Sequence, residues 1–309
     1  MSRTIGRRDF LKTGAGAGLT LAMGRFLGAG TSGAGRRSVI GVAIGEDYGR
    51  AAARAVALAG GIKRFVPKGA KVALLPNVQS RHPGSFTKPE ILRAVIRQCK
   101  KAGAAEVSAL SWQPMKQWED TGLKAVLDAE GAGLKLFEKD ESLFKAVPVP
   151  NGVQIKEVRL LAALLEHSVL INLPITKDHA GNKFTGSMKN LMGLNSPANN
   201  RTFHKPKWQT DPDDTAYLDQ SIVDLNKAFK PSLNVVDATE ILVSNGPFGP
   251  GQLMRPNRVV AGTDRVAIDA YCASLWGLKP EDIVQIKRGA EQGLGTINLD
   301  KVDVREEDL

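Results

Sequence analysis

Short apolar runs alternate with helical patterns along most of this chain. The runs at 72–75, 107–110, 134–137, 169–172, 234–238 and 259–263 are rich in Val, Leu, Ile and Ala, and their length and composition predict buried strands. Residues 91, 92, 95, 96 and 99 are also apolar, which is the spacing of one helix face. This alternation predicts an α/β fold: a mostly parallel sheet with helices on both faces, in a single large domain.

Several element boundaries carry recognisable signals. Thr87 and Pro89 predict a helix that starts at about residue 88, with Thr87 as its cap and Pro89 in its first turn. Asp264 suits the N-cap of a helix over 264–275, which is a purely structural role. Further helices are predicted over 121–130, 159–166, 187–194, 210–229 and 280–292, and an exposed, alternating strand over 152–158.

Residues 1–37 have the pattern of an export signal. Residues 7–12 read Arg-Arg-Asp-Phe-Leu-Lys, which resembles the core of a twin-arginine signal, and the Gly-rich segment 28–35 is the expected processing region. Arg25 interrupts the weakly apolar stretch and no run of about 18 apolar residues occurs, so we expect no transmembrane span after processing. The pattern predicts a periplasmic or otherwise exported protein, the twin-arginine translocase as a partner, and an α/β domain over 38–309. A basic tail without a targeting role is the alternative.

Charge and cysteine content exclude some classes of protein. Residues 1–37 carry seven of the 42 Lys and Arg residues and one of the 32 acids, which leaves 35 bases against 31 acids, or +4, for residues 38–309. This modest excess, with few aromatic residues, indicates no nucleic-acid partner. Cys99 and Cys272 lie in apolar helical patterns and are most simply small buried residues; whether they form a disulfide stays open. Two cysteines are too few for a four-thiolate cluster, so no iron–sulfur cluster is expected.

Polar groups follow the predicted strands at the points where the strands end. His179 and His204 lie in the segment after 169–172, Asp237 ends the strand at 234–238, and Asp264 follows the strand at 259–263. The carboxyl ends of parallel strands share one edge of a sheet, so these side chains can converge. Imidazoles and carboxylates ligate divalent metals and also act as acid–base pairs. A divalent metal held by His179, His204 and Asp237 is therefore one hypothesis, with the cofactor otherwise unknown.

A second set of residues can hold an anion. Lys177, Lys189 and Arg201 lie in the same segment as the histidines, beside the predicted helix at 187–194. We assign catalytic roles to His179, His204, Lys177 and Lys189, and substrate-binding roles to Asn77, Asn172, Asn190 and Arg201. An ordinary solvated surface loop is the alternative for this segment. The Gly-x-x-x-x-Gly-Lys-Ser/Thr, Gly-x-Gly-x-x-Gly and Gly-x-Ser-x-Gly patterns are absent.

Residues 70–292 resemble domain-of-unknown-function family 362. Three differences from the usual family pattern stand out: Leu75 where a lysine is common, Asp178 inserted before His179, and no appended ferredoxin-like cysteine motif. The last difference removes the basis for an electron-transfer role. The resemblance depends on residues 75–77, 87–90, 171–174, 236–237, 246–247 and 267–269, with Lys177, His179, Lys189, Asn190, Gly193, His204, Gly251 and Asp264.

Two functions from different classes fit these observations. The first is an enzyme of the cell envelope that acts on a small anionic substrate at a His/Lys/Asp site at the carboxyl edge of the sheet, with or without a metal. The second is an exported, non-catalytic binding protein for a small anion or organic acid. The substrate, the reaction and the oligomeric state are not encoded in any motif of the chain.

Overall fold

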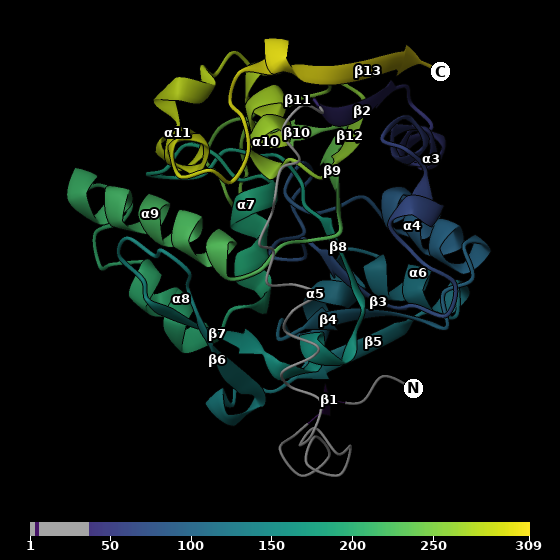
Figure 1. The fold of residues 1–309 in the computed structure, drawn as a ribbon, viewed down its shortest axis with the longest axis horizontal. Coiled ribbons are helices and arrows are strands. Elements are labelled where there is room, and N and C mark those ends of the chain that lie inside the picture. The colour runs from purple at the N-terminus through teal and green to yellow at the C-terminus, as the bar shows by residue number, and fades with distance from the viewer. Residues whose placement is uncertain (1–3, 6–36) are drawn as a thin grey trace.

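The computed structural model describes residues 4–5 and 37–309. Within these residues, nine strands form one sheet (Figure 1). The strand order is β1 (Thr4–Ile5), β5 (Gly133–Phe137), β4 (Glu106–Ser111), β3 (Lys71–Pro76), β8 (Val169–Leu173), β9 (Leu233–Ala238), β12 (Arg258–Gly262), β2 (Ser38–Ile44) and β13 (Val302–Asp308). Neighbouring strands run parallel except at β12, which is antiparallel to both β9 and β2.

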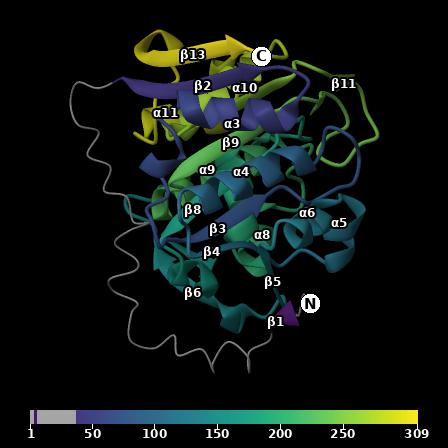
Figure 2. The ribbon, with the colours of Figure 1, turned by 90° about the vertical axis from the view of Figure 1, so that its right-hand side faces the viewer.

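Helices cover both faces of this sheet, as the sequence predicted. On one face pack α3 (Tyr48–Leu58), α4 (Pro89–Lys101), α5 (Met115–Asp120) and α6 (Leu123–Ala129). On the other pack α7 (Ser187–Asn190), α8 (Pro197–Phe203), α9 (Pro212–Ala228), α10 (Arg265–Ser274) and α11 (Val284–Glu291). Figure 1 shows α3, α4 and α6 to the right of the sheet and α9 and α11 to its left, and Figure 2 shows the α3 and α4 side.

Side-chain alternation along the strands produces two separate hydrophobic cores. In β3, Val72 and Leu74 join the core under α3 and α4, whereas Ala73 and Leu75 join the core under α9 and α10. Successive side chains of a strand point to opposite faces, so a strand that is apolar on both faces is buried on both. This explains why the central strands read as continuous apolar runs.

Smaller elements complete the fold. Two hairpins lie outside the main sheet: β6 (Phe144–Pro148) with β7 (Glu157–Leu161), and β10 (Ile241–Leu242) with β11 (Leu253–Met254). Short 3₁₀ helices span Ile62–Arg64, Glu141–Leu143, Ala162–Glu166, Leu191–Leu194, Pro280–Asp282 and Leu299–Lys301. Cys99 and Cys272 are buried and are not joined in a disulfide.

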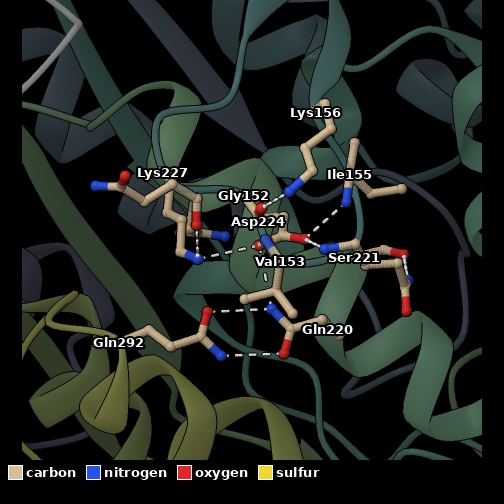
Figure 3. Close-up of polar contacts among 12 residues, drawn as sticks. Gly152, Val153, Ile155, Lys156, Gln220, Ser221, Asp224, Lys227 and Gln292 are labelled. Carbon is tan, nitrogen blue, oxygen red and sulfur yellow. Dashed lines mark hydrogen bonds and ion pairs between the residues drawn. The ribbon is translucent and has the colours of Figure 1, made fainter.

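The predicted strand over 152–158 is wrong because a distant carboxylate binds its backbone. Asp224 in α9 accepts hydrogen bonds from the backbone N–H groups of Val153, Gln154 and Ile155, at 2.9, 2.7 and 2.8 Å. Figure 3 shows this carboxylate in contact with residues of the 152–156 segment. These amides cannot pair with a neighbouring strand at the same time. The strand β7 therefore begins only at Glu157, and the predicted helix over 159–166 is reduced to its 3₁₀ second half.

Thr87 does not cap α4, which corrects a second prediction. Its hydroxyl donates to the carbonyl oxygen of Leu173 (2.6 Å) and accepts the backbone N–H of Asn77 (2.9 Å). Lys88 is the N-cap, and its own N–H donates to Oδ2 of Asp237 (2.8 Å). Asp264, by contrast, does cap α10, because its carboxylate accepts the N–H of Ala267 (2.9 Å).

Elements near both ends of the described chain complete the sheet. The sequence pattern offered no elements for 38–70 or 293–309, yet β2, α3 and β13 lie there and complete one side of the sheet. The twin-arginine motif at 7–12 lies outside the described residues. None of the helices within residues 37–309 combines the length and apolarity needed to cross a bilayer.

Candidate functional site

The segment after β8 continues along the carboxyl edge of the sheet before it turns back. Ile175 pairs with Asp237 at the end of β9, and Lys177 pairs with Thr185 across the turn. This pairing places residues 177–185 over the ends of the central strands. The short helix α7 follows at once and brings Lys189 and Asn190 to the same edge. The sequence analysis predicted a site at this edge because the last residues of parallel strands lie along one edge of a sheet.

A cavity of about 220 Å³ lies at this edge. Its walls come from the ends of β3 and β4, from segment 179–208, and from the Gly–Pro loop after β10. No Asp or Glu side chain is among the residues that line it. The lining residues are Leu75, Pro76, Asn77, Val78, Gln79, Ser111, Trp112, Gln113, His179, Thr185, Lys189, Asn190, Met192, Gly193, Asn200, His204, Trp208, Pro247 and Phe248.

His179 and His204 both face this cavity as neutral rings. Nδ1 of each ring lies 2.8 Å from a backbone carbonyl oxygen, that of Ala180 and that of Asn200 respectively. A carbonyl only accepts, so Nδ1 carries the proton and Nε2 keeps its lone pair. Burial, followed by the nearby charge of Lys189, lowers the pKa of His204 to about 4 and that of His179 well below its usual value.

An indole ring holds the two imidazoles together. The ring centroids of His179 and His204 are 6.4 Å apart, and the ring of Trp208 lies 4.8 Å from the first and 4.9 Å from the second. Such packing fixes ring orientations, because aromatic neighbours prefer tilted or edge-to-face contact. The two basic nitrogens therefore belong to one rigid cluster and not to a mobile surface loop.

Two lysines place positive charge at the site, and neither forms an ion pair within the described residues. Lys177 is fully buried, and its ammonium group donates to the Ser85 carbonyl (2.7 Å) and to Oδ1 of Asn77 (3.3 Å). Burial, with some repulsion from Lys189, lowers the pKa of Lys177 to about 7. Burial also lowers the pKa of Lys189 to about 8, although Asp219 opposes the change. The Lys189 ammonium has only the sulfur of Met192 at 3.8 Å as a hydrogen-bond partner in the described residues.

Four asparagines connect the strand ends below the cavity, and we call them the amide ladder: Asn77, Asn190, Asn172 and Asn234. Asn77 Nδ2 donates to Asn190 Oδ1 (3.0 Å), Asn190 Nδ2 to Asn172 Oδ1 (2.8 Å), and Asn172 Nδ2 to Asn234 Oδ1 (2.9 Å). At its two ends, Asn77 Oδ1 accepts from Lys177 and Asn234 Nδ2 donates to the Gly262 carbonyl (3.3 Å), so each buried amide both donates and accepts. Asn77 and Asn190 also line the cavity, whereas Asn172 lies beneath it.

The helix that carries Lys189 is anchored by Asp269 of α10. The carboxylate of Asp269 accepts the backbone N–H groups of Ser187 (2.6 Å) and Met188 (3.0 Å). Gly186 is required at this contact, since a Cβ there would lie 2.4 Å from Oδ1 of Asp269. Burial raises the pKa of Asp269 to about 7. The carboxylate thus fixes the first turn of α7, and with it the position of Lys189.

Four predicted site residues do not line the cavity, and the first is Lys177, which lies behind Asn77. Asp237 is committed elsewhere: its carboxylate accepts the N–H of Lys88 and both the N–H (3.0 Å) and the hydroxyl (2.7 Å) of Thr239. Asp237 is thus separated from the cavity that His179 and His204 line, and residues 37–309 contain no cluster of three His, Cys, Asp or Glu side chains that could hold a metal ion. Arg201 is exposed on α8, and Asn172 is a ladder member only.

Some residues of the site carried no usable sequence signal. Trp112 and Phe248 reach the cavity from separate loops, and Trp208 reaches it from the connection between α8 and α9. Asp219 looked like an ordinary polar position of the helix at 210–229, yet it is 1% exposed and acts on Lys189. The one available clue to Asp219 was its place on the inward-packing face of this helix, because charged residues are almost never fully buried without a partner.

Comparison with known proteins gives the chain a family and a few relatives. A thylakoid-associated protein of Synechocystis sp. is 25% identical over 242 residues, which cover 76% of this chain and 71% of the relative. The lactate racemase apoprotein of Thermoanaerobacterium thermosaccharolyticum superposes with a TM-score of 0.49 at 13% identity, over 72% of this chain and 53% of the racemase. The chain therefore spans about half the length of that enzyme. The family model described as "Domain of unknown function (DUF362)" matches residues 72–274, which is more than half of the chain, so this protein belongs to that family.

Proposed function

We propose that this protein is an enzyme that binds a small carboxylate in the cavity and moves a proton to or from it through His179 and His204. One observation carries the proposal: two neutral imidazoles present their basic nitrogens to a cavity that also holds the poorly paired ammonium group of Lys189. An anion supplies the negative charge that the lining lacks. Imidazole is the usual proton carrier at neutral pH.

Binding of an anion would also change the two rings. Burial and the positive charge of Lys189 keep both imidazoles weakly basic. A carboxylate placed beside them favours the protonated form, because an opposite charge within a few ångströms raises the pKa of histidine. Substrate binding would thus make the imidazoles more basic and better able to accept a proton. Lys177, which is behind Asn77, would hold the amide ladder in place and would not touch the substrate.

Deuterium exchange tests the proposal without knowledge of the reaction. The full chain is incubated in D₂O with a panel of 2-hydroxy, 2-oxo and 2-amino acids, and deuterium at the carbon next to the carboxylate is measured by NMR. We expect exchange with at least one acid, loss of exchange in His179→Ala and His204→Ala, and loss of binding in Lys189→Met. The matched control is Arg201→Met, which removes an exposed cation outside the cavity.

Two outcomes would contradict the proposal in different ways. Binding of an acid by the wild-type protein with no exchange of any proton would make the protein a non-catalytic binding protein. Absence of binding for every acid, with Lys189 intact, would remove the anion site itself.

We further propose, from residues 7–12 alone, that the protein is exported through the twin-arginine translocase. Replacement of the pair Arg7 and Arg8 by lysines should keep the protein in the cytoplasm, and fractionation of cells expressing both forms measures this. Equal distribution of the two forms would exclude this export route.

A further inference from the structure

The cavity has buried polar residues within it and an exposed aromatic ring at its mouth, together with buried apolar residues such as Leu75. Lys189, His179 and Asn77 are 8%, 4% and 5% exposed, whereas Phe248 is 58% exposed. All four line the same cavity. A ligand that satisfies both ends must insert its charged group and leave an apolar part near solvent.

Phe248 is held at the mouth by a fixed loop. The carbonyl oxygen of Phe248 accepts the hydroxyl of Ser80 at 3.1 Å, and the N–H of Gly246 donates to Oδ2 of Asp178 at 2.8 Å. Gly249 packs so closely on His82 that a Cβ would lie 2.7 Å from the imidazole ring. The exposure of the Phe248 ring is therefore a property of an anchored loop. Single exposed apolar residues are common on protein surfaces, but this one adjoins further apolar lining at Trp112 and Pro247.

Trp112 contributes a second aromatic ring to the lining of the same cavity. It follows β4, and its indole N–H is buried with no hydrogen-bond partner in the part of the chain that the structure describes. The ammonium group of Lys139 lies 5.5 Å from the centre of its ring. Because the indole nitrogen is inaccessible, Trp112 offers a ligand in the cavity its ring and not its N–H group.

The volume limits the size of the ligand. Pockets for drug-sized molecules enclose roughly 300–1,000 Å³, and an engineered cavity of about 150 Å³ accommodates benzene. The cavity here, at about 220 Å³, has room for one six-membered ring with a small substituent.

We propose that the ligand of this site is a monocyclic aromatic carboxylate, with its carboxylate toward Lys189 and the two imidazoles and its ring against Trp112 and Phe248. This inference takes the anionic end from the proposed function and adds the aromatic end from the mouth of the cavity. The full-length protein is titrated by calorimetry with benzoate, phenylacetate, cyclohexanecarboxylate and acetate. We expect benzoate or phenylacetate to bind at least tenfold more tightly than acetate and about threefold more tightly than cyclohexanecarboxylate.

Variants assign the preference to the rings. In Phe248→Ala and Trp112→Ala, the ratio of benzoate to acetate affinity should fall about three- to tenfold. The control is Met254→Ala, which truncates another exposed apolar side chain (40% exposed) away from the cavity and should leave the ratio unchanged. Thermal unfolding of each variant verifies that it is folded.

The outcomes separate the two proposals. Binding of acetate as tight as that of benzoate, or an unchanged ratio in both ring variants, overturns the aromatic ligand and leaves the proposed function standing. Equal affinity for benzoate and cyclohexanecarboxylate also overturns it, because apolar area alone would then explain binding. Failure of all four acids to bind overturns both proposals.

Discussion

The pKa values of two aspartates on one helix are shifted in opposite directions. Asp224 and Asp219 are five residues apart on α9, and both are buried. Burial alone would raise the pKa of Asp224, but hydrogen bonds from the N–H groups of Ile155, Val153 and Gln154 outweigh it and hold the pKa below its ordinary value (Figure 3). Burial raises the pKa of Asp219 to about 7, and its Oδ1 has no hydrogen-bond partner within the described residues. The supply of hydrogen-bond donors and the strength of desolvation together decide which buried carboxylate is a stable anion.

This difference also separates a structural site from a candidate functional one. Asp224 fastens the 152–156 segment to α9 and is saturated with donors, including the side chains of Gln220 and Lys227 at 3.1 Å each. Asp219 acts on the charge of Lys189, which lines the cavity, and its Oδ1 has no hydrogen-bond partner in the described residues. A buried carboxylate oxygen without a hydrogen-bond donor lowers the stability of the fold, but its protonation state can still respond to a bound ligand.

The largest expected effect is the loss of stability in Asp224→Asn. Whichever way the amide points, its NH₂ group would face backbone N–H groups that now donate to the carboxylate. We expect the free energy of unfolding to fall by about 3 kcal/mol, because buried donors lose a charged acceptor. Urea denaturation at pH 7 measures this. A loss below about 0.5 kcal/mol would show that the three amides do not depend on this carboxylate.

The same substitution at the other aspartate should have the opposite sign. Because the folded pKa of Asp219 is raised from 3.8 to about 7, ionisation of this group opposes folding increasingly as pH rises from about 4 and fully above 7. Asp219→Asn should therefore stabilise the protein by about 1 kcal/mol at pH 8, less than the whole shift implies because Lys189 loses its neighbouring acid. The gain should vanish near pH 4. Unfolding curves at both pH values test this, and a loss of stability at pH 8 would contradict the contrast.

The smallest effect should come from the amide pair that supports Asp224. Gln220 and Gln292 exchange two hydrogen bonds, at 3.1 and 3.0 Å, and join α9 to α11 (Figure 3). Gln292→Ala should cost about 0.5–1 kcal/mol, the net value of a partly exposed hydrogen bond. It should also leave the side chain of Gln220, which donates to Asp224, less restrained. Thermal unfolding compared with Gln252→Ala, an exposed glutamine before β11, would show whether the pair matters more than a surface glutamine.

Much of the sheet could be predicted from the sequence, because central strands that are buried on both faces leave continuous apolar runs. The runs at 72–75, 107–110, 169–172 and 234–238 all lie within observed strands. Two failures arise from bonds to distant elements. The N–H groups of 153–155 donate to Asp224 of α9, and the Thr87 hydroxyl is bonded to Leu173 and Asn77 and so does not cap α4.

The site was predictable in part for a related reason. His179, His204, Lys189, Asn77 and Asn190 meet at one cavity, as expected for residues that follow the ends of parallel strands. Lys177 and Asn172 lie one layer deeper, in hydrogen bonds to the amide ladder. Arg201 faces solvent because α8 turns it outward, and the aromatic mouth comes from loops whose paths no local pattern determines.

The amide ladder has a consequence for how the sheet is assembled. Its members lie in or next to β3, β8, β9 and α7. Each amide meets the next only when the strands are paired as observed, with Leu75 opposite Asn172 and Asn172 opposite Asn234. A slip of one residue would turn an asparagine toward the apolar core on the other face of the sheet. Mispaired sheets would therefore bury unsatisfied amides, so the floor of the cavity also acts as a check on correct strand alignment during folding.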